Sequence, residues 1–327
     1  MKKAIVTGAT GFIGSALVRK LLSMNIEVLA LGRKSWDDVD PNRLSESKGF
    51  TYIQIDMSEI EKLPQRAKEK GWESGDSCVF YNFAWGGISG LSDLDIEAQL
   101  NNVIWSANSV NAASKLNCKK FVHVGTMEEA FASRYLNLDY KKNSQYNRHV
   151  IHSIAKMTAR NVLKIISQKN KIDLIVATNS HVMGPNDYRD SFLRVTLVKL
   201  ISGDELVFSS GEQMFDVISV SDCANAYMKI GQFGKPCSEY WIGSGNPRPL
   251  KQYVKIMASL YPSGQDLQFG KMAYNDISLN KEDFSTKLLT QDTGFRPKYQ
   301  YEEIVHEVYS WLIKNELTEE KKLSGYQ

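Results

Sequence analysis

The first half of the chain alternates short apolar runs with segments whose apolar residues recur at helical spacing. After the run Ala4–Val6, the residues Ile13, Leu17 and Leu21 follow one another at four-residue spacing, which predicts a strand, a turn and a helix. Further strands are predicted at Val28–Leu31, Phe50–Ile55, Cys78–Phe83, Lys120–Val124 and Asp173–Ala177. Further helices are predicted at Glu59–Lys70, Asp93–Leu116 and Arg148–Gln168. Strands that alternate with helices favour an α/β fold with a doubly wound parallel sheet.

This alternation stops near residue 178. Short runs such as Leu206–Ser209 and Tyr240–Ile242, separated by turn dipeptides, favour a second and smaller α/β domain. We therefore expect a larger domain made of residues 1–177 with about 212–232, and a smaller one made of 178–211 with 233–313. The charge-dense residues 314–327 are predicted to be a solvated tail.

Composition excludes several classes of protein. Of the 327 residues, 43% are hydrophobic and 24% are charged, and 40 basic residues against 37 acidic ones leave a net charge of only +3. Such a balance does not attract nucleic acid or an anionic membrane, so a small-molecule partner is expected. No apolar run reaches the ~18 residues of a membrane span. Four cysteines without a CxxC pair predict reduced thiols in a cytoplasmic protein and no metal site: Cys78, Cys118, Cys223 and Cys237.

A glycine-rich turn lies between the first predicted strand and the first predicted helix. Its glycines have no Cβ, so a pyrophosphate can approach the backbone, and the helix N-terminus supplies N–H donors and a positive dipole end. A lone glycine triplet can be a tight turn, but in this position it predicts dinucleotide binding. The predicted contacts are Gly8, Thr10, Gly11, Phe12, Ile13 and Gly14.

Several motifs along the chain occur in the order of a known family. TGATGFIGSALVRKLL opens the chain, and NFAWGG, HVGT, HVMGP, DVISVSD, YWIGSGNPRPL and DTGFRPK follow. Together they resemble the extended short-chain dehydrogenase/reductase family of nucleotide-sugar epimerases, dehydratases and ketoreductases. The resemblance implies a Rossmann-type dinucleotide-binding domain and a smaller substrate-binding domain.

The end of the second predicted strand bears on the choice of cofactor. Members that bind NAD carry an acid there for the ribose 2′-hydroxyl, whereas this chain has Gly32, followed by Arg33 and Lys34. A guanidinium suits a 2′-phosphate, so NADP(H) is predicted rather than NAD(H), unless both cations are solvated loop charges. The resemblance also implies that Asp56 and Met57 hold the adenine.

The segment after the fourth predicted strand should follow the middle of the cofactor. The resemblance places Phe83, Ala84 and Trp85 against the cofactor and Gly86 beside the substrate, although Trp85 could equally be plain packing. Asn102 matches a family Asn that fixes the helix and backbone of the site.

The catalytic residues depart from the family pattern. In the family a Ser or Thr binds the substrate oxygen, a Tyr transfers the proton, and a Lys four residues after the Tyr binds the nicotinamide ribose and lowers the pKa of the tyrosine. The resemblance assigns the first role to Thr126 and the last to Lys156. The tyrosine is missing, and His152 stands in its place. An imidazole, with an ordinary pKa of about 6.5, can give or take a proton near neutrality. His152 is the predicted acid, Tyr146 is the reserve, and loss of catalysis is the alternative.

The substrate side also departs from the family. Met127 stands where the dehydratases have an acidic Asp, which disfavours a 4,6-dehydratase, although Glu128 could touch the substrate. His181 replaces an Asn of a family loop and is expected near the cofactor, and Phe215 replaces an Arg that meets the diphosphate. Other residues are expected to take over diphosphate or sugar contacts: Asn179, Arg189, Arg194 and Arg248.

The leading hypothesis is an NADPH-dependent reductase of a nucleotide-linked 4-keto-6-deoxy sugar, acting in surface polysaccharide biosynthesis. An epimerase on the same scaffold and a catalytically silent NADP-binding protein are the alternatives. The resemblance also implies a homodimer through the helices at Asp93–Leu116 and Arg148–Gln168. Its predicted contacts are Val103, Ile104, Ala107, Ile154 and Val162.

Overall fold

A computed structural model describes residues 1–75, 77–87, 95–130, 150–262, 264, 266–273 and 278–317. Its centre is a seven-stranded sheet in the order β11-β6-β5-β4-β1-β2-β3, and every neighbouring pair is parallel. The strands are β1 (Lys3–Thr7), β2 (Glu27–Gly32), β3 (Phe50–Gln54), β4 (Cys78–Asn82), β5 (Lys120–Thr126), β6 (Asp173–Asn179) and β11 (Glu239–Ile242). The predicted doubly wound sheet is confirmed.

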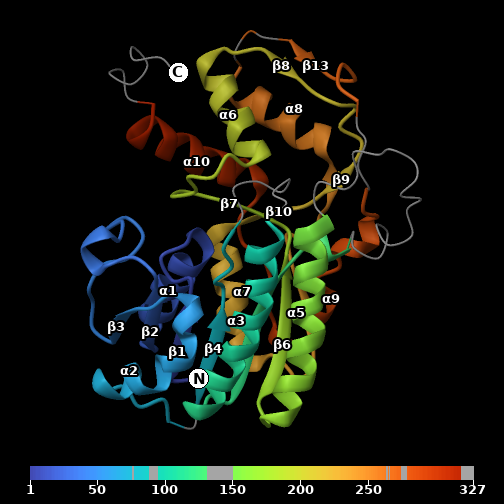
Figure 1. Cartoon of the computed structure of the whole chain (residues 1–327). Coiled ribbons are helices and arrows are strands. Elements are labelled where there is room, and N and C mark those ends of the chain that lie inside the picture. The colour runs from blue at the N-terminus through green and yellow to red at the C-terminus, as the bar shows by residue number, and fades with distance from the viewer. Residues whose placement is uncertain are drawn as a thin grey trace.

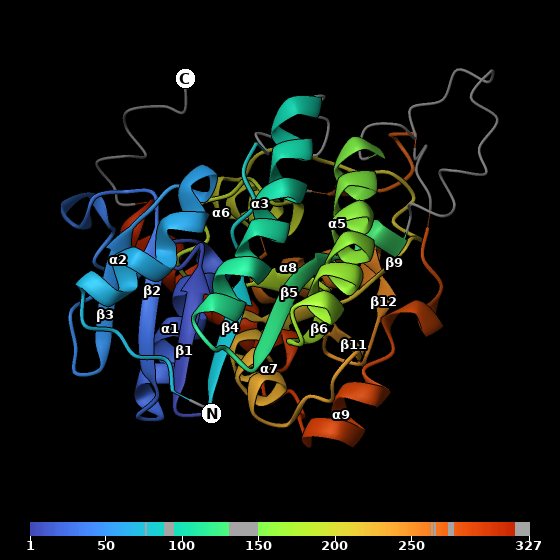
Figure 2. The ribbon, with the colours of Figure 1, turned by 60° about the horizontal axis from the view of Figure 1, so that its bottom comes forward.

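Helices cover both faces of this sheet (Figures 1 and 2). On one face α3 (Ile96–Lys115) lies beside α5 (Val150–Lys169) and contacts α2 (Leu63–Glu69). On the other face α1 (Phe12–Ser23) packs against α7 (Val220–Phe233). The predicted first residues of two helices, Asp93 and Arg148, lie outside the described residues.

The sheet residues divide between two cores by simple alternation. Along β2, Val28 and Ala30 belong to the core under α1 and α7, and Leu29 and Leu31 belong to the core under α2, α3 and α5. Because both faces are covered, the strand reads as a continuous apolar run rather than an alternating one.

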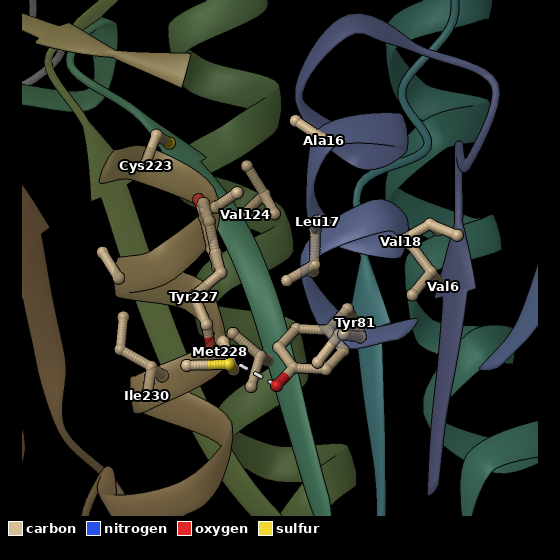
Figure 3. Close-up of a cluster of buried hydrophobic side chains, with 14 of the residues drawn as sticks. Val6, Ala16, Leu17, Val18, Tyr81, Val124, Cys223, Tyr227, Met228 and Ile230 are labelled. Carbon is tan, nitrogen blue, oxygen red and sulfur yellow. Dashed lines mark hydrogen bonds between the residues drawn. The ribbon is translucent and has the colours of Figure 1, made fainter. Parts of the chain in front are cut away.

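The core under α1 and α7 encloses the hydroxyl group of Tyr81 as well as apolar side chains (Figure 3). The Tyr81 hydroxyl reaches α7, where a Cβ at Gly231 would stand 1.8 Å from it. Gly231 therefore makes room for the tyrosine, whose hydroxyl donates to the backbone oxygen of Tyr227 at 3.3 Å. Around them pack Val6, Leu17, Val18, Val124 and Ile230.

A smaller group of helices lies above the carboxyl edge of the sheet (Figure 1). It has its own apolar core, built largely by α6 (Phe192–Ser202), α8 (Leu250–Leu260) and α10 (Tyr301–Asn315). Short strand pairs accompany it: β7 (His181–Met183) with β10 (Val217–Ser219), β9 (Met214–Phe215) with β12 (Arg248–Pro249), and β8 (Leu206–Val207) with β13 (Leu267–Gln268). The remaining described elements are α9 (Lys287–Thr293) and three short 3₁₀ helices, Trp36–Asp38, Met57–Lys62 and Lys281–Phe284.

Two predicted boundaries were wrong. Residues 239–242 were expected in the smaller domain, but β11 pairs with β6 in the main sheet, because the chain returns through α7 and covers an edge that would otherwise expose unpaired backbone. The solvated tail was expected from residue 314, but α10 continues to Asn315, Glu316 binds Arg194, and Leu317 is buried. In the described part of the chain no helix is long and apolar enough to cross a membrane.

Candidate functional site

The candidate site lies where β1 and β4 end side by side. These two strands are neighbours in the sheet, but the connections that follow them lead to opposite faces. In open parallel sheets, ligands bind in a crevice at the carboxyl ends of such a strand pair. The glycine turn follows β1, and the segment from Phe83 to Gly86 follows β4. The two segments touch, because a Cβ at Gly8 would stand 2.9 Å from the backbone nitrogen of Ala84.

The glycine turn has the geometry of an anion cradle. Gly8 has φ +63°, and its carbonyl accepts from the backbone N–H of Gly11 at 2.9 Å. A Cβ at Gly14 would lie 2.3 Å from that same carbonyl oxygen, so any larger residue would push the first turn of α1 away. Gly11 caps α1 without a side-chain hydrogen bond, and the first turn holds no acidic residue. The first N–H groups of α1 therefore suit a phosphate, and the turn fits a dinucleotide.

At the end of β2, a side chain at position 32 would have to displace the side chains of Tyr52 and Thr10. A Cβ at Gly32 would lie 2.5 Å from the hydroxyl oxygen of Tyr52 and 2.9 Å from Cγ2 of Thr10. The Tyr52 hydroxyl is fixed by donating to the backbone oxygen of Lys34 at 2.8 Å. Arg33 and Lys34 are exposed directly beside this packed spot. Tyr52 is a residue that sequence reasoning missed.

The expected adenine contacts lie at the end of β3. Asp56 caps a 3₁₀ helix and accepts from the backbone N–H and the hydroxyl of Ser58. These two hydrogen bonds, with a smaller contribution from Arg33, hold the pKa of Asp56 below its ordinary value. Met57 is half-buried against the core of the α2 face. Asp56 therefore presents a carboxylate near Arg33.

Hydrogen bonds to two side chains fix the segment after β4. Asn102 on α3 accepts from the backbone N–H of Gly86 at 2.9 Å and donates to its carbonyl at 2.8 Å. Thr7 accepts from the backbone N–H of Ala84 at 3.1 Å, and Phe83 packs edge-on against Tyr227 at 4.7 Å. The backbone that borders the crevice is thus held on both sides.

Lys156 lies buried behind this segment. Its Nζ donates to the carbonyl of Val124 at 3.0 Å and lies 3.8 Å from the centre of the Trp85 ring. Burial lowers the pKa of Lys156 from 10.5 to about 8, although the carboxylate of Glu129 acts in the opposite direction. An ammonium has three donors, so Lys156 can hold Val124 and still bind a hydroxyl.

His152 lies one helical turn before Lys156 on α5 and is only 6% exposed. Its ring stands edge-on to Trp85, with the centres 6.0 Å apart, and its Nδ1 lies 3.4 Å from Oε1 of Gln99. Trp85 donates its own N–H to the same Oε1 at 2.8 Å. Trp85 therefore has a specific polar contact in the site and is more than plain packing.

The buried carboxylate of Glu129 holds the backbone of Thr126. The backbone N–H of Thr126 donates to Oε1 of Glu129 at 2.8 Å, and the other oxygen of Glu129 pairs with Arg160 at 2.9 Å. The threonine Oγ1 accepts from the backbone N–H of Glu128 at 3.4 Å. Glu128 itself is buried beside it.

Three further residues of the candidate site escaped sequence reasoning, and for two of them the spacing carried a signal. Arg160 stands four residues after Lys156, on the same face of α5, and Gln99 stands three residues before Asn102, on the same face of α3. Glu129 had no comparable signal, because its contact to Thr126 depends on the turn that follows β5.

The substrate-side predictions are only partly brought to the crevice. Asn179 was expected to touch a sugar, and its side-chain amide oxygen accepts from the Tyr227 hydroxyl at 2.8 Å. Met127 packs against an apolar cluster with Leu279 and Phe284. His181 is half-buried against Phe215, with ring centres 5.3 Å apart, and removal of its ring from water lowers its pKa to about 4, so the ring is neutral.

The three arginines have different surroundings. Arg189 pairs with Asp187 at 2.7 Å and lies over the Phe12 ring, beside the glycine turn. Arg194 is bound by Glu316 and serves packing. Arg248 lies over the Tyr253 ring and lines a cavity of about 250 Å³.

Tyr146, the reserve acid, lies outside the described residues. Among the residues that the structure does describe, no group of three or more potential ligands could hold a metal ion.

Comparison with known proteins agrees with this geometry. Over 312 residues the chain is 21% identical to CDP-abequose synthase of Salmonella muenchen, covering 94% of this chain and 97% of that protein. The UDP-glucose 4-epimerase of Thermotoga maritima, solved with UDP-glucose, has a similar fold, with a TM-score of 0.73, 17% identity and coverage of 95% and 99%. The WbmF enzyme of Bordetella bronchiseptica, solved with NADH, also has a TM-score of 0.73, with 15% identity and coverage of 99% and 95%. A sequence profile of the NAD-dependent epimerase/dehydratase family matches residues 4–243, and the chain belongs to that family.

Proposed function

We propose that the chain is an NADPH-dependent reductase of a nucleotide-linked 4-keto-6-deoxy sugar, acting in surface polysaccharide biosynthesis. Family membership supports a nicotinamide cofactor, and two of the similar proteins are named for nucleotide-linked sugars, CDP-abequose and UDP-glucose. The observation that carries the choice of a reductase is the packing around Gly32, because a cofactor site built for NADPH suits an enzyme that exchanges its cofactor at every turnover.

The preference for NADPH rests on space and charge together. Position 32 has no acid that would bind a ribose 2′-hydroxyl, and the Cβ of one would meet the side chains of Tyr52 and Thr10. Arg33 and Lys34 offer two exposed cations to a 2′-phosphate at the same edge. WbmF was solved with NADH, so this preference would distinguish the chain from that neighbour.

The residues of the site divide the work of ketone reduction. The reduced nicotinamide, when bound, supplies the hydride. Thr126 donates its hydroxyl hydrogen to the ketone oxygen and so polarises the carbonyl, and its backbone is held by Glu129. His152 gives a proton to that oxygen as negative charge develops on it. Lys156 binds the nicotinamide ribose with the donors that Val124 leaves available.

Met127 argues against dehydration. A 4,6-dehydratase needs an acid at this position to protonate a leaving hydroxyl, and a thioether cannot supply one. The side chain instead packs against the cluster of Leu279 and Phe284. An epimerase remains the second candidate, favoured by the named activity of the Thermotoga maritima neighbour.

Turnover with purified protein tests the proposal. The protein is mixed with NADPH and a panel of 4-keto-6-deoxy sugars linked to CDP, dTDP, UDP or GDP, and the products are followed by absorbance and NMR. Stoichiometric NADPH oxidation with formation of the alcohol supports the reductase. Interconversion of sugar isomers without net oxidation would make the chain an epimerase. Tight NADPH binding without conversion of any sugar would make it a silent binding protein.

We also propose a homodimer through α3 and α5. Ile104 is 54% exposed on α3, and Ile96 and Leu100 continue the same apolar stripe at four-residue spacing. On α5, Ile154 and Ile165 are exposed on the side away from the sheet. Val103, a predicted contact, is instead buried against α5 of its own chain.

Light scattering at micromolar concentration tests the dimer. A mass twice that of the chain is expected, and Ile104→Glu should shift it to the monomer, because a charge in an apolar interface is costly. Phe233→Glu, at another exposed position on α7, is the matched control and should leave the mass unchanged. A monomeric wild-type protein would refute the proposal.

A further inference from the structure

The amide of Gln99 can adopt only one orientation. The side chain is 2% exposed, and its Oε1 accepts from the Trp85 N–H at 2.8 Å while its Nε2 donates to the carbonyl of Gly87 at 2.9 Å. An indole N–H can only donate and a carbonyl can only accept. A flipped amide would therefore set hydrogen against hydrogen at Trp85 and oxygen against oxygen at Gly87.

The fixed amide determines the hydrogen on the neighbouring imidazole. Nδ1 of His152 lies 3.4 Å from the same Oε1, and a carbonyl oxygen has two lone pairs, so it can accept from Trp85 and His152 together. Nδ1 must then carry a hydrogen. In the neutral ring the lone pair is left on Nε2, which is the only nitrogen that can take up or release a proton without breaking the contact to Gln99.

Trp85 keeps this arrangement rigid from the other side. Its ring stands at 86° to the His152 ring, and the ammonium of Lys156 lies 3.8 Å from the Trp85 ring centre. Asn102, one turn further along α3, latches the Gly86 backbone that carries Trp85 into the site. Three elements, the end of β4, α3 and α5, thus converge on one imidazole.

We propose that Gln99 is a positioning residue that holds His152 in the Nδ1–H tautomer, so that the proton passed to the substrate oxygen leaves from Nε2. This role rests on the proposed function, in which His152 is the acid. The imidazolium releases the Nε2 proton to the oxygen, the C=O becomes C–OH with the hydride from NADPH, and NADPH becomes NADP⁺. The Nδ1–H bond to Gln99 persists, so the ring does not turn during the cycle.

A neutral amide is well suited to this position. A carboxylate at the same distance would also hold Nδ1–H, but its charge would favour the imidazolium and delay proton release. An apolar side chain would remove the acceptor that favours a hydrogen on Nδ1. Gln99→Glu and Gln99→Leu therefore separate orientation from charge, and Gln65→Leu on the exposed face of α2 is the matched control.

The tautomer can be read directly on the full-length protein in its resting state. Histidine labelled with ¹⁵N gives different shifts for protonated and unprotonated ring nitrogens, and loss of a signal in His152→Phe assigns it among the five histidines. The wild type, Gln65→Leu and Gln99→Glu are expected to show Nδ1–H. Gln99→Leu should show a mixture. A wild-type ring with its hydrogen on Nε2, or an unchanged ring in Gln99→Leu, would overturn the proposal.

Kinetics give a second readout. Gln99→Leu should lower kcat at least about tenfold with little change in the KM for NADPH, and Gln99→Glu should restore turnover with the alkaline limb of its pH profile moved upward by about one unit. If the pH dependence of kcat is the same in both variants as in the wild type, Gln99 does not position His152. An Nδ1–H ring in a protein that reduces no keto sugar would refute the proposed function and leave the tautomer assignment standing.

Discussion

The two halves of the candidate site are built by different means. On the side of β1 and α1, the contacts proposed for a pyrophosphate come from backbone, and three glycines at fixed spacing make room for them. On the side of α3 and α5, the proposed chemistry depends on side chains from separate elements, where His152, Trp85 and Gln99 meet. A backbone cradle tolerates almost no change, whereas a side-chain cluster can be rebuilt if its hydrogen bonds are satisfied again.

This difference explains where the chain departs from its family pattern. The glycine turn keeps the pattern because a Cβ at Gly14 would meet a carbonyl oxygen, and no neighbouring change can move that oxygen cheaply. The position proposed for proton transfer does not keep it. A histidine there is accompanied by an indole and an amide that fill the space and bind its ring.

The largest expected effect comes from a substitution in the side-chain half of the site. His152→Phe should lower turnover by roughly 10²–10⁴-fold and leave NADPH affinity nearly intact, since general acid catalysis contributes on that order and the ring does not bind the cofactor. Steady-state kinetics and a fluorescence titration measure the two effects. His306→Phe on α10 is the matched control. Normal turnover in His152→Phe with a large loss in Tyr146→Phe would transfer the acid role to Tyr146.

The next largest expected effect tests how the cofactor half of the site selects NADPH. Arg33→Ala should weaken NADPH binding by about 1.5–3 kcal/mol, or roughly 10- to 150-fold, and leave NADH binding unchanged, because a charge-assisted contact to the 2′-phosphate is lost. Calorimetric titration with both cofactors measures this. Lys62→Ala, which removes an exposed cation paired with Glu59, should change neither affinity. Equal losses for both cofactors in Arg33→Ala would show that Arg33 does not select NADPH.

A change in the glycine turn should act on both cofactors alike. Gly14→Ala puts a Cβ 2.3 Å from the Gly8 oxygen, and the resulting overpacking of about 1–3 kcal/mol should weaken NADPH and NADH by similar factors of roughly 5 to 150. Gly71→Ala is the control, because its Cβ would meet no atom within 4 Å although φ is +70°. It should lower the melting temperature without changing affinity. Undiminished binding in Gly14→Ala would disprove the cradle.

The smallest expected effect concerns Lys156 and pH. Burial lowers the pKa of Lys156 to about 8, while an unfolded lysine keeps the ordinary 10.5, so between these values the unfolded chain binds more protons. The free energy of unfolding should therefore gain a contribution that rises with pH in this window, by at most about 1.4 kcal/mol per pH unit. Denaturant titrations of wild type and Lys156→Met measure it as a difference. Parallel pH dependences of the two proteins would contradict the lowered pKa.

Part of this site could be predicted because the signal was local. Strand, turn and helix at the N-terminus follow from apolar spacing and three glycines within seven residues, and Lys156 and His152 follow from a spacing along one helix. Gln99 is 53 residues from His152 and meets it only because α3 and α5 pack together. The covering of Gly32 by Tyr52 likewise depends on the pairing of β2 with β3.

The sequence by itself determined the order of strands and helices, the phosphate turn and the identity of the groups that could transfer a proton, since these depend on residue type and on spacing within single elements. Tertiary structure decided which groups meet. It placed β11 in the main sheet and turned the side-chain amide oxygen of Asn179 toward Tyr227. It also brought the side chains of Gln99, Trp85 and His152 together at the end of β4. Hydrogen-bond partners far apart in the chain are selected by packing, and packing depends on the whole fold rather than on any one segment.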